Sequence, residues 1–382
     1  MTASRAPGPT PDGPDRPALV LRGLKKSFGD APAVDGVDLD VASGEFITLL
    51  GPSGSGKTTT LRMIAGFTAQ SSGTIEIGGL DMGRIPPHRR DVGMIFQNYA
   101  LFPHMTAAQN VAFPLEMRQT GRPEITRRVA EALTLVRLED LGHRYPRQLS
   151  GGQQQRIAFA RAVVFNPRLL LMDEPLGALD KKLREALQLE VMHISRQLGA
   201  TVIYVTHDQE EALVMSDRIA IFNRGKIEQL GHGDDLYDRP VSLFVADFIG
   251  ESNILRGRFE RDGGGGWLAR ADGRWRVGDA QANRAALAHG AAAALVVRPE
   301  RWRMVAADDG AAAESGTNRV AASVRDALYL GATRKYALSL PDGQSATVRQ
   351  HVDGGDPVWL PGDRVHLTWA VDDAVLVSDP GG

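Results

Sequence analysis

The stretch that decides the fold runs from Glu45 to Thr60 and reads EFITLLGPSGSGKTTT. Its first part, Phe46 to Leu50, is a largely apolar run, which predicts a buried parallel strand. Gly51 to Thr58 follow at once and satisfy the pattern G-x-x-x-x-G-K-[ST]. Thr59 to Ala65 contain neither glycine nor proline and can begin a helix. A strand, a glycine-rich loop and a helix in this order form the setting in which such a loop binds phosphate.

Each part of this loop has a physical role at a polyphosphate. Gly51, Gly54 and Gly56 allow backbone angles that turn successive N–H groups inward. The start of the helix adds its partial positive charge. Lys57 is expected to reach the β- and γ-phosphates, and the Thr58 hydroxyl to ligate Mg²⁺. A chance glycine-rich turn is the alternative, but the preceding strand makes this rare, so the loop predicts nucleotide binding.

Composition limits the class of protein. The chain has 382 residues, too many for one average domain, so two domains are expected. Its net charge is −2, which gives no reason to expect a nucleic-acid partner, and it has no cysteine, which excludes disulfides and thiolate chemistry. No apolar run approaches the roughly 18–20 residues of a membrane span, and the N-terminus lacks the apolar core of a secretory signal. Work at a membrane would therefore need partner chains.

A second helix start suited to an anion lies far along the chain. Leu149 to Arg156 read LSGGQQQR, so Ser150, Gly151 and Gly152 stand immediately before the helical stretch Gln153 to Phe165. A single chain has no evident need for two phosphate-binding helix starts so far apart. Two copies of the chain facing each other would use both.

Two acids, Asp173 and Glu174, follow the apolar run Leu169 to Met172. A carboxylate at the end of such a strand lies beside the phosphate loop, where it can hold Mg²⁺. Glu174 is then available to polarise an attacking water. A helix cap is the alternative, and Pro175 is compatible with it. The phosphate loop upstream favours the metal and the base.

A histidine ends another predicted buried strand. Thr201 to Thr206 read TVIYVT, and His207 follows. Ligands gather at the carboxyl ends of strands in open α/β sheets, so His207 is a candidate ligand contact. Four other histidines lack such a placement and are expected to be structural or surface residues: His88, His104, His143 and His193.

Two features stay open on the residues alone. Phe28 could stack on an adenine, although a core or hairpin aromatic is the favoured interpretation. The stretch Asn98 to Thr106 reads NYALFPHMT and is rich in aromatic residues and proline. It could be a docking surface for a helix of another protein or a loop closed over the core, and the residues favour neither.

The pattern changes around Asp234 to Gly250. Residues 1–17 are crowded with proline and glycine and predict a disordered tail, and the first domain is expected over 18–240. Residues 241–382 contain short strands and glycine runs, which predict a small β-rich domain without a catalytic constellation. Three tryptophans there are expected in its core: Trp302, Trp359 and Trp369.

Together the motifs resemble the ATP-binding cassette (ABC) ATPases. The phosphate loop, Gln97, LSGGQQQR, LLLMDEP, Leu176 to Asp180 and VTHD occur in the order and spacing of that family, over Leu19 to Leu230. The tail is similar to the accessory TOBE-type domain of bacterial importer ATPases, through VRPE at Val297 to Glu300 and through Tyr329 to Gly331. Phrases such as LFPHMT are most similar to the polyamine (spermidine/putrescine) importer ATPases, with ferric-ion uptake ATPases close behind.

The resemblance implies an α/β fold. Its first part would be a P-loop NTPase domain of the ABC ATPase type, with an antiparallel β subdomain and a helical subdomain. A small β-rich domain of the OB or TOBE type would follow. The resemblance also implies ATP and Mg²⁺ as ligands, and it places Phe28 where the family stacks an aromatic ring on adenine, which reverses the favoured interpretation of that residue.

The resemblance assigns site residues by their positions in these motifs. Glu174 would be the general base, His207 would contact the γ-phosphate and the facing subunit, and Gln97 would complete the catalytic set. Thr58, Gln97 and Asp173 would organise Mg²⁺. The positions implied at ATP are Phe28, Gly51, Pro52, Ser53, Gly54, Ser55, Gly56, Lys57, Thr58, Thr59, Ser150, Gly151, Gly152, Gln153 and Asp180.

The resemblance also implies partners. Two copies of the chain would close head to tail around two ATP molecules, with Lys57 of one copy and Ser150 of the other at the same γ-phosphate. Two transmembrane permease subunits would dock at Asn98 to Met105, at the cytoplasmic face of the inner (plasma) membrane. An extracytoplasmic solute-binding protein would act indirectly, and no nucleic acid would be bound.

Rival members of the same superfamily fit less well. ABC ATPases that act on chromosomes insert a long coiled coil between the phosphate loop and the LSGGQ motif, and the sequence between Lys57 and Ser150 shows no heptad run. Those that act on ribosomes carry two cassettes, and this chain has one. A regulatory subunit with a vestigial site is disfavoured because Lys57, Asp173, Glu174 and His207 are all present.

Overall fold

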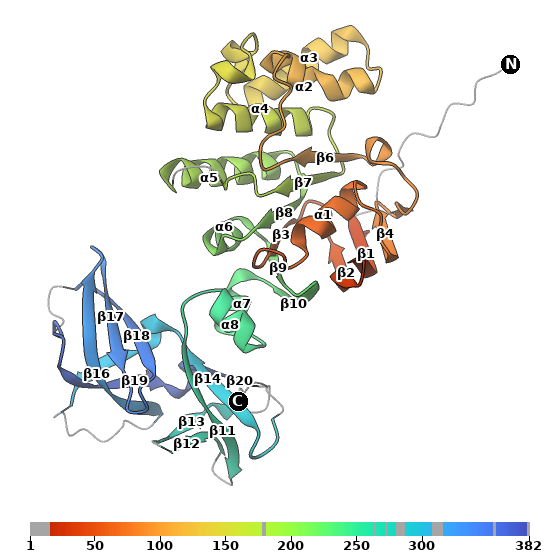
Figure 1. The fold of residues 1–382 in the computed structure, drawn as a ribbon. Helices are drawn as coiled ribbons and strands as arrows, with labels where there is room; N and C mark the ends of the chain where they lie inside the picture. Colours follow the sequence, from red (N-terminus) through yellow and green to blue (C-terminus); the bar gives the residue numbers. More distant parts are fainter. Residues whose placement is uncertain are drawn as a thin grey trace. The chain divides into compact units, whose positions relative to one another are not determined.

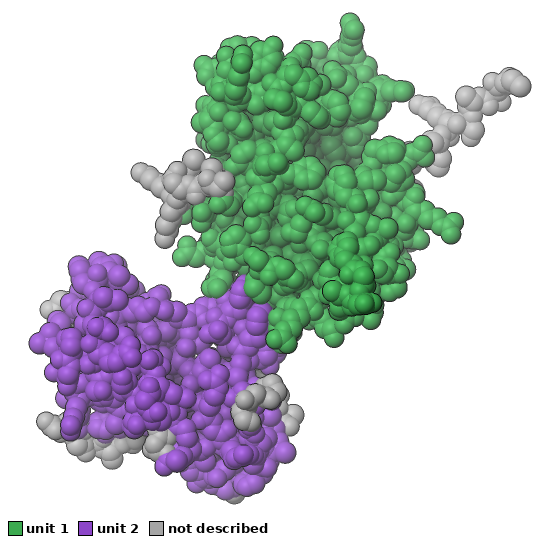
Figure 2. Space-filling model, viewed as in Figure 1, with its two compact units in different colours: residues 1–233 green, residues 234–382 purple. Residues whose placement is uncertain are grey.

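The computed structural model describes residues 16–177, 181–262, 265–271, 273–279, 287–307, 316–353 and 357–379, apart from the side chains of 181–183. The chain divides into two compact units, residues 1–233 and 234–382 (Figure 2). The predicted tail lies outside the described residues as far as residue 15. The domain limits 18–240 and 241–382 remain predictions.

A six-stranded sheet lies at the centre of the first unit (Figure 1). In order across the sheet, its strands are β10 (Lys226–Gly231), β9 (Arg218–Asn223), β3 (Phe46–Leu50), β8 (Thr201–Thr206), β7 (Leu169–Asp173) and β6 (Val92–Ile95). All neighbours are parallel except β10, which forms a hairpin with β9.

Both faces of this sheet are covered. On β8, Val202 and Tyr204 enter one hydrophobic core, while Ile203 and Val205 enter another. Strands β3, β7 and β8 are buried at every residue, as expected for parallel strands between two layers. The predicted buried strands that precede the phosphate loop, the acid pair and His207 are confirmed.

The second core is shared with an antiparallel sheet. Its strands, in order, are β2 (Ala31–Val41), β1 (Leu19–Phe28), β4 (Ser72–Ile77) and β5 (Leu80–Asp81). Helix α1 (Lys57–Ala65) contributes Leu61, Met63 and Ile64 to the same core. The helix that begins at the phosphate loop is therefore anchored by the apolar side chains of its second half.

The first core is built largely by helices (Figure 1). They are α2 (Ala107–Met117), α3 (Arg122–Leu135), α4 (Gly151–Val163) and α5 (Lys181–Gln197), with the short α6 (Gln209–Met215) after β8. Thr106 begins α2 through a capping box with Gln109. Three 3₁₀ turns connect these parts, at Pro87–Arg89, Glu139–Leu141 and Pro146–Gln148.

The second unit begins with α7 (Gly233–Asp238) and α8 (Leu243–Phe248) and is otherwise built of strands. One sheet has the order β13 (Gly273–Val277), β12 (Gly265–Arg270), β11 (Asn253–Asp262), β14 (Ala292–Val297) and β20 (Ala374–Ser378). The other has the order β15 (Arg303–Ala306), β19 (Arg364–Ala370), β16 (Thr317–Tyr329), β17 (Thr333–Ser339) and β18 (Ser345–His351). Both sheets are antiparallel, which confirms the predicted β-rich domain.

Tryptophans and a buried arginine hold the second unit together. Trp302 and Trp369 are buried and stack with ring centroids 5.1 Å apart, and Trp359 packs against the same core, as predicted. Arg298 is 5% exposed and donates to the backbone carbonyls of Tyr237 and Ala246. Its side chain thereby attaches both helices to the end of β14, which gives the VRPE motif a structural role in this unit.

A comparable buried arginine in the first unit yields a stability prediction. Arg90 is 5% exposed and donates to the carbonyl oxygens of Met63, Ile64, Met82 and Ile85. Replacing Arg90 with methionine leaves these acceptors without a donor, so we expect the free energy of unfolding of the first unit to fall by about 3 kcal/mol. Urea denaturation followed by far-ultraviolet circular dichroism measures this loss. Tryptophan fluorescence would not report on the first unit, because all five tryptophans belong to the second unit.

Arg22→Met is the control for this measurement. The Arg22–Asp40 ion pair is about half exposed on both sides, so water and salt screen it and its loss should destabilise the unit far less than the loss of Arg90. Equal losses in the two variants would contradict the role given to Arg90.

Candidate nucleotide-binding site

The phosphate loop joins β3 to α1 in a conformation that requires glycine. A Cβ atom on Gly51 would lie 2.4 Å from the Phe222 carbonyl oxygen, so no side chain fits there. Gly56 has φ 106°, in the left-handed region, and a Cβ atom there would meet the Ala33 carbonyl oxygen at 2.5 Å. The loop therefore combines close backbone approach with a turn of the chain directly into the N-terminus of α1.

Lys57 is folded into this loop. The residue is 4% exposed, and its ammonium group donates to the carbonyl oxygens of Gly51 and Pro52 at 2.7 and 2.9 Å. Burial lowers the pKa of Lys57, and the carboxylates of Glu174 and Asp173 oppose that shift. In the same loop, the buried Oγ of Ser55 has no hydrogen-bond partner among the described residues. A buried cation and an unpaired hydroxyl in one loop fit an anion with several oxygen atoms.

Thr58 and Asp173 meet beside the loop. The Thr58 hydroxyl donates to Asp173 Oδ1 at 3.0 Å. Asp173 ends β7 and is 8% exposed; burial raises its pKa, and the hydrogen bond from Thr58 lowers it. Oxygen ligands of this kind suit Mg²⁺. Among the residues that the structure describes, no three acids, histidines or cysteines gather as a ready-made metal site, so phosphate and water would have to complete the shell.

Glu174 lies between two polar partners from neighbouring strand ends. Its Oε1 is 3.1 Å from His207 Nδ1, and its Oε2 accepts from Gln97 Nε2 at 3.4 Å. These residues follow β7, β8 and β6, which are adjacent in the sheet. Glu174 has φ 46°, an uncommon angle for this residue, and its N–H donates to the Val205 carbonyl at 3.0 Å. Strain of this kind collects at functional sites, where it holds a side chain in a required direction.

The second helix start is present as predicted, but it is separate from the phosphate loop. Ser150 is the N-cap of α4: its hydroxyl accepts from the Gln153 N–H at 3.3 Å, and Gln153 accepts from the Ser150 N–H at 2.9 Å. Ser150 and Gly151 are exposed, whereas Gly152 is buried. No hydrogen bond or ion pair among the described residues joins this helix start to Lys57, Asp173 or Glu174. Within one chain, the two halves predicted for the site are not brought together.

Phe28 lies at the exposed end of β1. Its side chain is 59% exposed, and Lys26 Nζ stands 5.1 Å from the ring centroid. Of the two residue-based interpretations, a core aromatic is wrong and a hairpin aromatic holds, because Phe28 pairs with Ala31 at the β1–β2 turn. Its exposed ring remains a candidate for stacking. Asp180 lies outside the described residues.

The loop over Asn98 to Met105 is held by two buried side chains that the sequence gave no reason to select. Arg161 of α4 donates to the carbonyls of Tyr99 and Ala100, both at 2.8 Å. Asn110 of α2 is fully buried and bonds to the backbone of Phe102 in both directions. Tyr99 and Ala100 have φ 60° and 46°. A hydrogen-bonded arginine on a helix leaves no periodic signal, so only the structure reveals this support.

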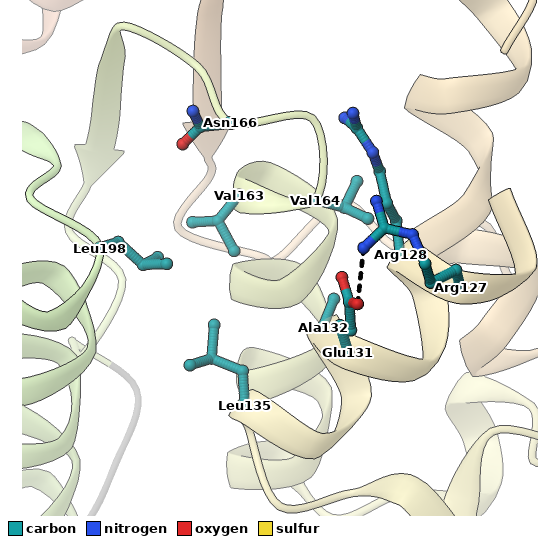
Figure 3. Close-up of a pocket in the computed structure, with 9 residues that line it drawn as sticks. All are labelled: Arg127, Arg128, Glu131, Ala132, Leu135, Val163, Val164, Asn166 and Leu198. Carbon is teal, nitrogen blue, oxygen red and sulfur yellow. Dashed lines mark hydrogen bonds and ion pairs between the residues drawn. The ribbon is translucent and has the colours of Figure 1, made fainter. Parts of the chain in front are cut away.

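A separate cavity of about 370 Å³ lies where α3 and the end of α4 face Leu198 (Figure 3). Arg127 and Glu131 form an ion pair at its rim, at 2.7 Å. None of its lining residues belongs to the predicted site. No helix in the described part of the chain is long and apolar enough to cross a membrane.

The chain is similar to known sequences along its whole length. The ABC transporter family matches residues 34–177, and the TOBE domain family matches residues 295–377. A spermidine/putrescine import ATP-binding protein of Rubrobacter xylanophilus is 45% identical over 382 residues, covering 100% of this chain and 99% of the relative. A protein of the same name from Acidothermus cellulolyticus is 48% identical, over 94% of this chain and 93% of the relative.

Solved structures agree with the sequence comparison. A dimeric bacterial ABC transporter cassette superposes with a TM-score of 0.51 at 33% identity, over 56% of this chain and 98% of the cassette. A dimeric cassette in a post-hydrolysis state, bound to ADP and Pi, gives a TM-score of 0.50 at the same 33% identity and coverage of 56% and 98%. With its phosphate loop, its LSGGQ helix and this likeness, the chain belongs to the ATP-binding proteins of the ABC transporter family.

Proposed function

We propose that this chain is the ATP-hydrolysing subunit of an importer for polyamines. The observation that carries the proposal is the length of the likeness. Relatives named as spermidine/putrescine import ATP-binding proteins match 100% and 94% of the chain, at 45% and 48% identity. The likeness thus extends through the β-rich second unit, beyond the cassette that accounts for 56% of the chain.

The phosphate loop would bind the triphosphate of ATP. Lys57 would exchange its bonds to the Gly51 and Pro52 carbonyls for bonds to the β- and γ-phosphates. Thr58 and Asp173, with Gln97, would hold Mg²⁺, which supplies positive charge to the phosphate oxygens. The exposed ring of Phe28 would stack on the adenine.

Glu174 would be the general base. Its carboxylate already has directional partners in Gln97 and His207, so it is oriented before substrate arrives. It would accept a proton from the water that attacks the γ-phosphorus, while the bond from that phosphorus to the leaving oxygen of ADP breaks. His207 would hold the γ-phosphate in line.

A second copy of the chain would complete the site. The helix start spans Ser150 to Gln153, and its first two residues, Ser150 and Gly151, are exposed. No bond among the described residues ties it to the phosphate loop of its own chain, so it would be free to meet the γ-phosphate of another. Asp180 would lie at the contact between the copies. ATP would then hold the dimer closed, and hydrolysis would release it.

Two permease subunits in the membrane would dock at Asn98 to Met105. The clamps from Arg161 and Asn110 give this loop a defined shape, which a docking surface requires. The chain would accordingly act at the cytoplasmic face of the plasma membrane, and a solute-binding protein on the other side would deliver the cargo.

The test is purification of the tagged chain from native membranes, followed by reconstitution of the recovered complex in vesicles. We expect two membrane subunits to co-purify, and ATP hydrolysis to rise when spermidine or putrescine and the cognate binding protein are supplied. Stimulation by ferric ion instead would overturn the polyamine assignment. Recovery of ribosomes or DNA would overturn transport itself. The segment between Lys57 and Ser150 argues against binding to chromosomes, because its longest helix has 14 residues and is no long coiled coil.

A further inference from the structure

The side chain of His207 makes few contacts that could fix its orientation. Its side chain is 57% exposed, and among the described residues Glu174 alone contacts its ring as a polar partner, at 3.1 Å. The residue stands in the short connection between the end of β8 and the start of α6. The direction of its ring is therefore set by the backbone on either side, at Thr206 and Asp208.

A single hydroxyl joins these two neighbours. Thr206 Oγ1 accepts a hydrogen bond from the Asp208 N–H at 3.0 Å and donates to Glu211 Oε2 at 2.7 Å. The bond to Asp208 closes a tight turn around His207. Because the single hydroxyl proton is donated to Glu211, the lone pairs of the Thr206 oxygen are left to accept the Asp208 N–H. The bond to Glu211 also holds this oxygen in the position that closes the turn.

Glu211 is a buried carboxylate that accepts hydrogen bonds from two hydroxyls of β8. It is 2% exposed, and its Oε2 also accepts from the hydroxyl of Tyr204 at 2.7 Å. Tyr204 and Thr206 are two apart on β8, so their side chains leave the same face of the sheet and reach one oxygen atom. Burial raises the pKa of Glu211, and the hydroxyls of Thr206 and Tyr204 oppose the shift.

The same network reaches the helix that follows the predicted dimer contact. Asp208 caps α6 by accepting from the N–H groups of Glu210 and Glu211. Arg184, in the first turn of α5, donates to Asp208 Oδ2 at 3.1 Å and lies 3.9 Å from Glu211 Oε1. The residue before His207, Thr206, is thus bonded to the buried Glu211, and the residue after it, Asp208, is bonded to the half-buried Arg184.

We propose that Glu211 is a positioning residue for His207, acting through the Thr206 hydroxyl to fix the turn that aims the imidazole at the γ-phosphate. The inference rests on the proposed role of His207 in ATP hydrolysis. Loss of the Glu211 acceptor frees Thr206 to rotate and releases the Asp208 N–H, so the ring loses its direction while the phosphate loop is untouched. The defect therefore falls on the chemical step and not on ATP binding.

Two substitutions of Glu211 separate positioning from charge. Both hydroxyl bonds end on one oxygen, so the amide oxygen of Glu211→Gln can accept both. We expect this variant to keep kcat within about threefold of the wild type, as suits a conservative replacement. Glu211→Leu removes the acceptor, and we expect kcat to fall about 100-fold with KM for ATP unchanged. Equal activity of the Leu variant and the wild type would overturn the inference, and so would equal loss in the Gln and Leu variants.

Thr206→Val keeps the test decisive if the Leu variant fails to fold. It preserves the shape of a side chain that is 2% exposed and removes the bridging hydroxyl, so kcat should again fall with KM unchanged. Thr48→Val is the matched control. Thr48 is equally buried and stands opposite Tyr204 on the neighbouring strand, and among the described residues its hydroxyl bonds to Ser216 alone. A similar loss of kcat in both threonine variants would show a general effect of the sheet and contradict the inference.

His207→Ala, measured beside these variants, separates the proposed role of His207 from the proposed role of Glu211. If it hydrolyses ATP like the wild type, the proposed role of His207 fails. If it is inactive while Thr206→Val and Glu211→Leu are fully active, the role of His207 stands and Glu211 does not position it.

Discussion

A Glu174→Gln variant is expected to bind ATP like the wild type and to hydrolyse it about 100-fold more slowly or worse, the range typical for loss of a general base. Glutamine retains the size of the side chain and can still meet His207 and Gln97, so the site keeps its shape. It cannot take up the proton of the attacking water. Steady-state release of phosphate measures the loss of turnover, and equilibrium binding of ATP measures the retained affinity.

The same variant should accumulate as a dimer when ATP is added. Hydrolysis releases the two copies in the proposed cycle, so a chain that binds without hydrolysing remains closed. Size-exclusion chromatography with and without ATP reports this state. Glu131→Gln, which removes an exposed carboxylate on α3, is the control and should neither lose activity nor accumulate as a dimer. Hydrolysis at the wild-type rate by Glu174→Gln would remove Glu174 from the role of base.

A mixture of two inactive variants, Lys57→Ala and Ser150→Asp, is expected to regain activity. Each should be inactive alone, because every site of a head-to-tail dimer takes Lys57 from one copy and Ser150 from the other. Aspartate preserves the N-cap of α4, so this variant should fold, yet its charge would repel the γ-phosphate. Random pairing makes about half of the dimers mixed, and each mixed dimer contains one site free of both substitutions.

The control mixture is Lys57→Ala with Glu174→Gln. Both residues belong to the same half of the site, as their place around one phosphate loop shows. Every site in such a mixed dimer therefore carries a substitution, and no activity should return. Recovery in this mixture, or none in the first, would contradict the assignment of Ser150 to the facing subunit.

Short-range spacing was sufficient for the parts of the site that lie in one segment. A strand, the loop from Gly51 to Thr58 and α1 are consecutive, so residue order alone predicted that Lys57 and Thr58 stand where a glycine-rich loop enters a helix. The same holds for Asp173 and His207, each of which directly ends or follows a buried apolar strand. Local geometry needs only neighbouring residues, and the sequence supplies these without reference to the rest of the chain.

The contacts between site residues that lie far apart in the chain were decided by the tertiary structure alone. Gln97 and Glu174 are 77 positions apart, and they meet because β6 and β7 are adjacent in the sheet, an order that no local pattern encodes. The left-handed turn at Glu174 and the arginine clamp at Tyr99 exist only where the surrounding structure imposes them. Glu211 shows the limit most clearly. In the sequence it is one acid of a polar run after His207, and only the structure shows that it is buried and bonded to Tyr204 and Thr206, on the strand that leads to that histidine.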